Sequence, residues 1–441
     1  MARQNLRIWA AVATGIVAVL AAVAALALPR LLGQAGERTT APPAAPSEAA
    51  PSAGIPTATQ PATPGGSTGA TAPPSTPGGP APSSAPGVPP PASRAATLLA
   101  SMSLEQRVGQ VMMVSSPVTG PDAAILDALR RLHVGNVFLK GRTTAGAAAV
   151  AGVVAALKAE ATPAATLGVG QFVATDQEGG QVQILRGPGF SEIPTALAQG
   201  GMDPGALRAA AAVWGRELAA AGVNVNLAPV MDTVPSAAFA PQNAPIGRFQ
   251  REYGYTAQAV SAHGLAFAQG MADAGVAATA KHFPGLGRVT ANTDTSAGVT
   301  DSVTGRHDPY VAPFADGVRS GVPWMMISNA RYSAIDPGND AVFSPTVIQG
   351  MLRGDLGFRG IVVSDDLCDA VQLSGVAAED RGTGFLAAGG TMVLCTNAQL
   401  APRVWQGMVD RAKTDPAFAR TVDAAALAVL EAKDRAGLLP R

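Results

Sequence analysis

The sequence predicts an α/β protein, a single (β/α)8 barrel preceded by an N-terminal apolar segment and a linker rich in Pro, Ala, Ser and Thr. Three observations predict this fold. Apolar β-like runs alternate with helical patterns eight times, several runs end in polar clusters, and about 350 residues remain for the folded part. Such alternation is typical of a parallel sheet. Eight repeats favour closure into a barrel over an open sheet.

The N-terminal segment, residues 1–32, has the pattern of an export signal or a membrane anchor. Arg3 and Arg7 precede an uncharged apolar run over residues 8–28, and basic residues before such a run stay on the cytoplasmic side. The run is about twenty residues long, which is long for a cleaved signal and just enough to span a bilayer. We therefore expect the rest of the chain to be extracytoplasmic, either membrane-anchored or secreted.

Residues 33–93 form the predicted linker. They consist mostly of Pro, Ala, Ser, Thr and Gly, with almost no large apolar side chain to bury. A segment of this composition cannot offset the entropy lost on ordering. We expect a disordered, partly polyproline spacer, followed by one folded domain over residues 94–441.

The eight β-like runs and the helical patterns between them define the expected barrel. The runs cover residues 108–114, 134–139, 171–175, 223–230, 277–281, 323–328, 360–364 and 391–395. The clearest helical patterns cover residues 121–132, 144–160, 206–221, 256–274, 309–320 and 344–356. Apolar residues recur at helical spacing in each, and several begin with Pro, Ser or Thr.

The composition argues against several kinds of partner. Lys and Arg number 31 and so do Asp and Glu, so the formal net charge is zero and gives no electrostatic grip on nucleic acid. No His/Cys cluster has the spacing of metal ligands, and no Gly-rich phosphate loop follows the first strand. We expect a monomer that needs no metal or cofactor and acts on a small neutral molecule.

Polar residues at the ends of the predicted strands indicate where the site lies. These clusters are Asp176-Gln177-Glu178, Asp232, Lys281-His282, Asn329 and Asp365-Asp366. In (β/α)8 barrels the chemistry sits at the carboxyl ends of the strands. The clusters therefore predict a single polar site at the mouth of the barrel.

Two segments carry a resemblance to a known family. The run over residues 360–367 delivers Asp365 and Asp366 to a strand end, its lead-in covers residues 352–360, and residues 280–287 read Ala-Lys-His-Phe-Pro-Gly-Leu-Gly. Together they resemble glycoside hydrolase family 3, specifically its β-N-acetylglucosaminidase branch. The resemblance implies a retaining glycosidase with Asp365 as nucleophile. The alternative is that Asp365 caps the following helix, a role that suits Asp366 better.

The same resemblance implies four substrate-binding residues. Lys281 and His282 would hydrogen-bond sugar hydroxyls, and Asp176 would accept hydrogen bonds from the non-reducing sugar. Arg248, in the run over residues 246–249, is similar to a substrate-contacting arginine, although the spacing around it is shorter than in the family. The alternatives are a buried, paired lysine with a core histidine, a surface ion pair for Arg248, and a loop-capping role for Asp176, although that role suits Glu178 better. We expect a structural role for the Asp232 carboxylate.

The sequence departs from the family pattern at the acid/base. In this branch a loop after the Lys-His-Phe-Pro-Gly segment carries an Asp-Ser-His run whose histidine is the acid/base. An ungapped alignment places Asn292, Thr293 and Asp294 there, and Leu286 where another histidine is usual. Asp294 could supply the proton if bound sugar excludes water, and Asp301 is a weaker candidate.

The expected function is a retaining β-N-acetylhexosaminidase acting on cell-wall fragments that contain N-acetylglucosamine, as in peptidoglycan turnover. Two alternatives stay open: a catalytically impaired sugar-binding protein and a β-glucosidase. The latter fits less well because the chain leaves no room for the extra domain of larger family 3 β-glucosidases. Cys368 and Cys395 lie at neighbouring strand ends, where either a disulfide or two buried thiols would fit.

Overall fold

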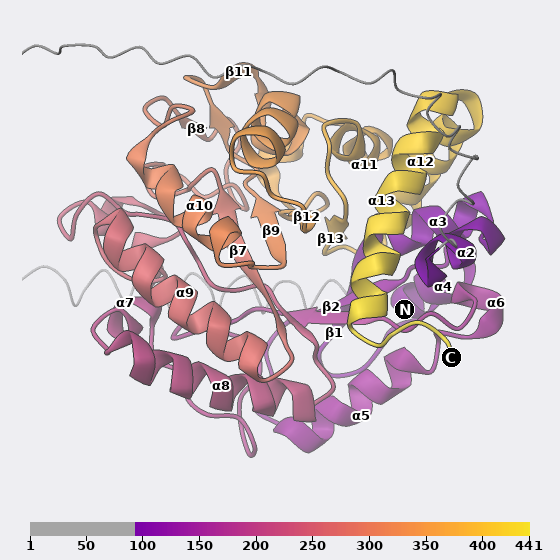
Figure 1. Ribbon diagram of the computed structural model, residues 1–441, viewed down its shortest axis with the longest axis horizontal. Helices are drawn as coiled ribbons and strands as arrows, with labels where there is room; N and C mark the ends of the chain where they lie inside the picture. The colour runs from indigo at the N-terminus through magenta and orange to yellow at the C-terminus, as the bar shows by residue number, and fades with distance from the viewer. Residues whose placement is uncertain (1–92) are drawn as a thin grey trace, which may run out of the picture. The chain divides into compact units, whose positions relative to one another are not determined.

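The computed structural model describes residues 93–441 and contains an eight-stranded parallel barrel surrounded by helices (Figure 1). The barrel strands are β1 (Met112–Pro117), β2 (Asn136–Lys140), β3 (Phe172–Thr175), β6 (Val225–Asn226), β7 (Ala277–Phe283), β9 (Trp324–Ile327), β12 (Ile361–Ser364) and β13 (Val393–Cys395). Each strand pairs in parallel with its neighbours in the order β12-β9-β7-β6-β3-β2-β1-β13. A bridge between Val363 and Met392 closes the ring. The predicted fold is confirmed.

Two predicted strands differ in extent from the observed ones. Residues 108–110 do not open β1 but end a helix, α3 (Leu104–Gln110). Ser103 and Gln106 form a capping box at its start, and this Ser-x-x-Gln pattern was present in the sequence. The predicted strand over residues 223–230 is regular only at β6. Pro229 has no N–H to donate to a ladder, and beyond it Val230 forms an isolated parallel bridge with Lys281.

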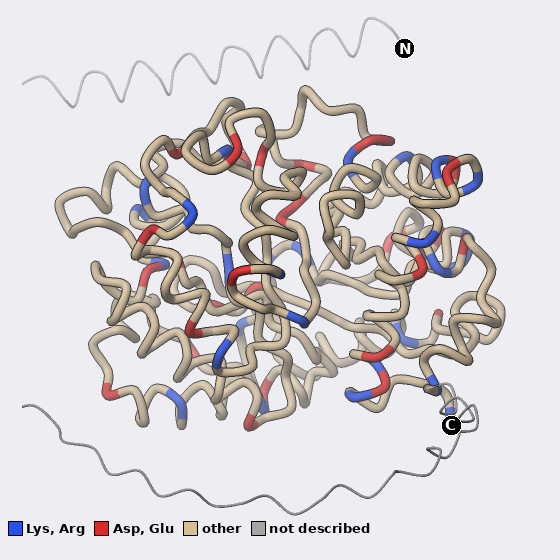
Figure 2. The backbone as a smooth tube through the Cα atoms, turned by 45° about the horizontal axis from the view of Figure 1, so that its top comes forward, with Lys and Arg blue, Asp and Glu red and all other residues tan. Residues whose placement is uncertain are grey.

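Helices lie around the barrel (Figure 1). The α-helices are α2 (Arg94–Ser101), α3, α4 (Ala123–Arg131), α5 (Ala147–Lys158), α6 (Pro163–Thr166), α7 (Ala196–Gln199), α8 (Pro204–Ala220), α9 (Ala257–Asp273), α10 (Ala312–Arg319), α11 (Ala378–Ala387), α12 (Ala401–Thr414) and α13 (Pro416–Arg435). The helical pattern predicted over residues 344–356 is the π-helix η5 (Thr346–Asp355). Acidic and basic residues are mixed over the described chain (Figure 2).

Two small sheets and several short 3-10 turns were not predicted. The hairpin of β4 (Gln177–Gly179) and β5 (Val182–Gln183) follows β3, while β8 (Thr300–Asp301), β10 (Arg331–Tyr332) and β11 (Asp336–Asp340) form a second sheet. The 3-10 turns are η1 (Ala240–Gln242), η2 (Gly247–Phe249), η3 (Pro309–Val311), η4 (Ala341–Phe343) and η6 (Val371–Leu373). Most of these elements lie in the loops that follow barrel strands, so they build up the face where the strands end.

The two ends of the described chain lie together. Arg94 Nη2 donates to the carbonyl oxygen of Pro440 at 2.7 Å, and its Nη1 reaches Asp434 at 3.2 Å. The Gly170 N–H, just before β3, donates to Leu438 O at 2.7 Å. Both ends therefore lie near the amino ends of the strands. The predicted segments 1–32 and most of 33–93 fall outside the described residues. Among residues 93–441, no helix is long and apolar enough to cross a membrane.

Lys433 is an unusual core residue on α13. Its side chain is fully buried, and Nζ donates to Gln110 Oε1 at 2.8 Å and to Gly135 O at 3.0 Å. These acceptors are neutral, and within residues 93–441 Lys433 has no carboxylate partner. Burial lowers the pKa of Lys433 to about 7 because desolvation disfavours the ammonium.

This burial predicts a pH-dependent stability. An unfolded lysine keeps its proton up to about pH 10, so between pH 7 and that value the unfolded chain binds more protons than the folded one. The free energy of unfolding should therefore rise with pH relative to Lys433→Met, by at most about 1.4 kcal/mol per pH unit. Urea denaturation at pH 7, 8 and 9 measures the difference. Lys413→Met, at an exposed lysine, is the control, and parallel curves for wild type and Lys433→Met would contradict the assignment.

Candidate active site

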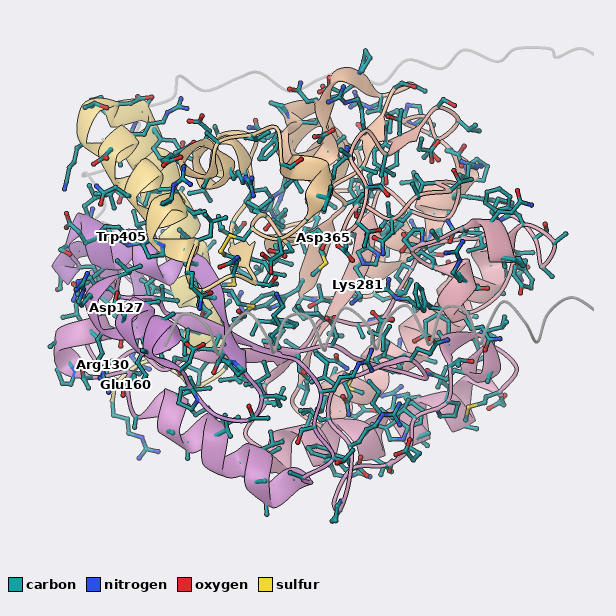
Figure 3. All side chains as sticks on the ribbon, turned by 180° about the vertical axis from the view of Figure 1, so that it is seen from behind. Asp127, Arg130, Glu160, Lys281, Asp365 and Trp405 are labelled. Atoms are coloured by element: carbon teal, nitrogen blue, oxygen red, sulfur yellow. A yellow bond between two sulfur atoms is a disulfide. The ribbon has the colours of Figure 1, made fainter. Side chains whose placement is uncertain are left out.

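A pocket of about 410 Å³ opens where the barrel strands end. Five of the six predicted site residues line it: Asp176, Lys281, His282, Asp294 and Asp365. Two of them, Lys281 and Asp365, are labelled in Figure 3. The pocket therefore gathers residues that lie nearly two hundred positions apart in the sequence.

Asp365 directly follows the buried strand β12. Its backbone N–H donates to Ile327 O at 2.9 Å, and one carboxylate oxygen accepts the Asp366 N–H at 2.8 Å. The side chain is half-buried and faces the pocket. Burial raises the pKa of Asp365 to about 6, with a further rise from the negative charge of Asp294, while His282 opposes both. The carboxylate is thus poorly solvated, which suits a nucleophile.

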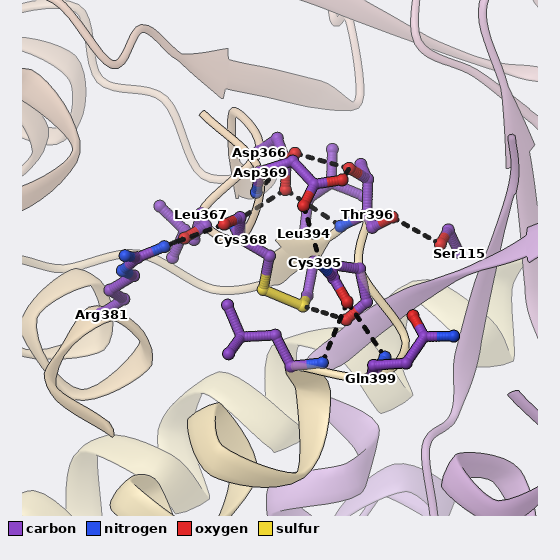
Figure 4. Close-up of a disulfide and its surroundings, with 12 residues drawn as sticks. Ser115, Asp366, Leu367, Cys368, Asp369, Arg381, Leu394, Cys395, Thr396 and Gln399 are labelled. Atoms are coloured by element: carbon purple, nitrogen blue, oxygen red, sulfur yellow. Dashed lines mark hydrogen bonds between the residues drawn. A yellow bond between two sulfur atoms is a disulfide. The ribbon is translucent and has the colours of Figure 1, made fainter. Parts of the chain in front are cut away.

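The neighbouring Asp366 has a structural role, but it binds loop residues and does not cap a helix as expected. It accepts the backbone N–H groups of Cys368 at 2.9 Å, Asp369 at 3.1 Å and Thr396 at 2.9 Å. The Thr396 hydroxyl donates to it at 2.5 Å. These four hydrogen bonds, visible in Figure 4, occupy both oxygens. Asp366 therefore fixes the loop after β12.

A charge network forms one wall of the pocket. Lys281 Nζ lies 2.6 Å from both Asp176 Oδ1 and Glu178 Oε1, and Arg251 makes a two-pronged contact with Glu178 at 2.7 and 2.8 Å. Burial alone would raise the pKa of Glu178, but Arg251 and Lys281 outweigh it and lower this pKa to about 2. The same pairing keeps the pKa of Lys281 raised despite its burial. Lys281 is therefore buried and paired, as in the alternative to a substrate-binding role, and it also lines the pocket.

Two expectations at this wall need correction. Arg248 lies on η2, is exposed, and lines a separate depression with Pro241 and Tyr255. Gln250 has a positive φ of 55°, so the chain turns between Arg248 and Arg251, and it is Arg251 that enters the pocket. Glu178, expected to cap a loop, is instead the buried partner of Arg251 and Lys281.

Asp232 holds His282 in place. It is fully buried and accepts the ring Nδ1–H of His282 at 2.7 Å, the His282 backbone N–H at 3.1 Å and the Leu286 N–H at 2.8 Å. The expected structural role of Asp232 follows from these contacts. Because Nδ1 is bound to a carboxylate, Nε2 is the ring nitrogen left for a ligand.

The loop after β7 brings Asp294 to the pocket. Asp294 is exposed at the mouth, and its backbone N–H donates to Asn292 Oδ1 at 2.9 Å. The chain has 4 histidines, and among the described residues only His282 lines this pocket. Asp301 does not line it: its carboxylate accepts the N–H groups of Val303 and Thr304 at 2.8 Å. Asp294 is the carboxyl group of this loop that lines the pocket together with Asp365.

Comparison with known proteins places this pocket in a family. The family model described as Glycosyl hydrolase family 3 N terminal domain matches residues 103–432. The chain belongs to glycosyl hydrolase family 3. It is therefore a glycoside hydrolase, and the recognition made from residues 280–287 and 360–367 is confirmed.

Three other proteins show what the chain is similar to. A beta-hexosaminidase of Stenotrophomonas maltophilia is 31% identical over 309 residues, which are 68% of this chain and 88% of that protein. The crystal structure of a beta-N-acetylhexosaminidase from Beutenbergia cavernae is 51% identical with a TM-score of 0.75, covering 76% of this chain and 99% of that one. A family 3 beta-N-acetylglucosaminidase from Paenibacillus is 27% identical with a TM-score of 0.67, covering 77% and 64% respectively.

The two cysteines form a disulfide beside this family 3 pocket (Figure 4). Cys368 lies in the loop after β12 and Cys395 ends β13, with 5.0 Å between their Cα atoms. The possibility left open by the sequence is thereby settled in favour of a bridge. It ties the loop after Asp365 to the neighbouring strand.

The environment of Asp365 predicts the acid side of the pH profile. A nucleophile must be ionised, so kcat/KM should fall as the pH drops through about 6. Asp294→Asn removes a negative charge that raises the pKa of Asp365, so this limb should move to lower pH. The measurement is kcat/KM against pH with a 4-nitrophenyl glycoside, which needs little acid assistance. The exposed Asp410→Asn variant should keep the wild-type limb, and an unmoved limb in Asp294→Asn would show that the two carboxylates do not interact.

The disulfide predicts sensitivity to reduction. Its cysteines are 27 positions apart, and a closed loop of that size stabilises a fold by roughly 3–4 kcal/mol in the chain-entropy model. Reduction should therefore lower both the melting temperature and the activity, because the loop that carries Asp366 loses its tether. The control is the double variant Cys368→Ser/Cys395→Ser, which reductant should not affect further. A reduced wild type with unchanged melting temperature and activity would refute the expectation.

Proposed function

We propose that this family 3 enzyme is a retaining β-N-acetylhexosaminidase with Asp365 as the nucleophile and Asp294 as the acid/base. The observation that carries the proposal is the half-buried Asp365, which opens into the pocket and interacts electrostatically with Asp294. The 51% identical relative named beta-N-acetylhexosaminidase supports N-acetylglucosamine as the sugar. Asp176, His282 and Arg251 would hold its hydroxyl groups.

The proposed reaction has two steps. In the first, an Asp365 oxygen attacks the anomeric carbon, the glycosidic C–O bond breaks, and Asp294 gives its proton to the leaving oxygen. In the second, Asp294 takes a proton from water, the water oxygen attacks the same carbon, and Asp365 is released. Asp294 is exposed in the free enzyme, so the bound sugar must cover it before the first step.

We further propose that the enzyme works outside the cytoplasm on cell-wall fragments, as in peptidoglycan turnover, and that residues 1–32 direct export or anchor it in the membrane. The disulfide supports this location because such bonds persist in oxidising compartments. The apolar run over residues 8–28 supports it too. Alkaline phosphatase fusions compared with and without residues 1–32 test export directly.

A sugar-binding protein without turnover is the second candidate, favoured by the absence of a histidine from the loop over residues 285–299. A screen of 4-nitrophenyl glycosides decides between the two. Release of nitrophenol from the N-acetyl-β-glucosaminide, and not from the β-glucoside, supports the enzyme and its sugar preference. Binding of N-acetylglucosamine with no release from any glycoside would favour the binding protein.

Replacing the nucleophile tests the first role. Asp365→Asn keeps the shape of the side chain but cannot attack, so kcat/KM should fall by roughly 10³-fold or more with an unchanged melting temperature. Mass spectrometry should also find the sugar attached to the wild-type peptide that contains Asp365. The exposed Asp410→Asn variant should behave as wild type. Near-normal activity of Asp365→Asn would mean that another group attacks.

Replacing the acid/base tests the second role. Asp294→Ala should slow a natural disaccharide by roughly 10²–10⁴-fold and a 4-nitrophenyl glycoside far less, because nitrophenol leaves without a proton. Azide should restore part of the lost rate, since it attacks the intermediate without a base. Equal slowing of both substrates would show that Asp294 is structural.

A further inference from the structure

The loop that carries Asp294 is held by a segment that follows the nucleophile strand. The η6 residues Val371 and Gln372 donate their backbone N–H groups to Asp294 O at 3.3 Å and Thr293 O at 3.0 Å. The Gln372 side chain accepts the Val299 N–H at 2.8 Å, and its amide reaches back to Val299 O at 3.4 Å. Hydrogen bonds to two buried residues, Thr293 and Val299, thus hold the loop on both sides of the exposed Asp294.

The Gln372 side chain also forms a hydrogen bond with a third segment, the end of β11. Its Nε2 also donates to Asp340 Oδ1 at 3.1 Å, at the end of β11, and Asp340 pairs with Arg331 on β10. The Gln372 side chain is 8% exposed, so its hydrogen bonds are shielded from water. One amide therefore links the Asp294 loop, the β10–β11 hairpin and the segment after β12.

The other side of the loop is also fixed. The buried Asn243 donates its Nδ2 hydrogens to Leu286 O at 2.8 Å and Val289 O at 2.7 Å. Its Oδ1 accepts the N–H groups of Ile246 and Gly247. Asn243 thus holds the start of the loop, while Gln372 holds the part around Asp294. The Cys368–Cys395 bridge in turn fixes the segment four residues before Gln372.

We propose that Gln372 is a positioning residue for proton transfer, which holds Asp294 at a fixed place relative to Asp365. The inference rests on the proposed function, in which Asp294 is the acid/base. Proton transfer requires the donor within hydrogen-bond reach of the leaving oxygen, and displacement by about 1 Å can cost about 10²-fold in rate. An exposed carboxyl group on a loose loop would lack that geometry. Gln372 supplies it from the same segment that follows the nucleophile.

The variant Gln372→Met tests the proposal because it keeps the length of the side chain and removes the side-chain hydrogen bonds to Val299 and Asp340, while the backbone bond to Thr293 O stays. We expect near-normal kcat/KM for the 4-nitrophenyl N-acetyl-β-glucosaminide and a loss of about 10²-fold for the phenyl glycoside, whose leaving group needs a proton. The acid limb of the pH profile should move in the same direction as in Asp294→Asn. Gln349→Met is the matched control, since Gln349 is exposed and distant from the pocket lining, and both substrates should give wild-type rates.

Asp294→Ala, measured in parallel, separates two kinds of failure. Suppose that Asp294→Ala lowers kcat/KM only for the phenyl glycoside, while Gln372→Met lowers it equally for both substrates. Gln372 is then structural, and the inference is overturned while the proposed function stands. If Asp294→Ala shows no selectivity, the acid/base assignment fails and the inference falls with it. Should Gln372→Met not fold, Gln372→Glu keeps the acceptor for Val299 and sets a second carboxylate against Asp340. The same selective loss is expected there, and equal slowing would again overturn the inference.

Discussion

The pocket depends on neutralising one buried ammonium group, that of Lys281. A buried charge is tolerated only when it is paired and hydrogen-bonded. Asp176 and Glu178 both lie 2.6 Å from Lys281 Nζ, and Arg251 balances the second carboxylate. Asp176 directly follows β3, Glu178 lies on β4, Lys281 lies on β7, and Arg251 lies in the loop after β6. Their mutual attraction holds the segments after β3 and β6 against β7, and the Asp176 carboxylate keeps a fixed place at the pocket surface.

Two adjacent aspartates show how environment assigns chemistry. Asp366 accepts four hydrogen bonds and is committed to loop structure. Asp365 accepts one, from the Asp366 N–H, and its remaining oxygen is open to the pocket. A carboxylate with few hydrogen bonds in a poorly solvated place is more basic, which agrees with its raised pKa. The same strand end thus provides a reactive group and the support that holds its loop.

The sequence predicted the residues that sit on strand ends and missed those that depend on loop conformation. Asp176, Lys281, His282 and Asp365 could be placed together because parallel strands of a barrel end on one face. Arg251 could not be chosen over Arg248, because the choice depends on the left-handed conformation of Gln250. The disulfide was undecidable for a similar reason, since it requires the loop after Asp365 to return to β13.

The ungapped alignment identified Asp294 as a candidate, but it did not predict which residues hold the Asp294 loop in place. Gln372 gave no signal in the sequence, because its hydrogen bonds connect it to Val299 and Asp340, which lie 73 and 32 positions away. The π-helix over 346–355 was predicted as a helical segment without its distinctive winding, since hydrophobic spacing does not separate the two closely. Long-range polar contacts are therefore the main features of the site that could not be predicted from the sequence.

The placement of the two ends of the described residues, 93 and 441, has a practical consequence for the folded domain. Arg94 meets Pro440 and Asp434, and Leu438 contacts Gly170 at the amino end of β3, whereas the pocket lies at the opposite, carboxyl ends. Ends that already touch can be joined by a short peptide, and new ends can be opened in an exposed loop. A circularly permuted enzyme, or one attached to a solid support through its C-terminus, would therefore keep its pocket facing the solution.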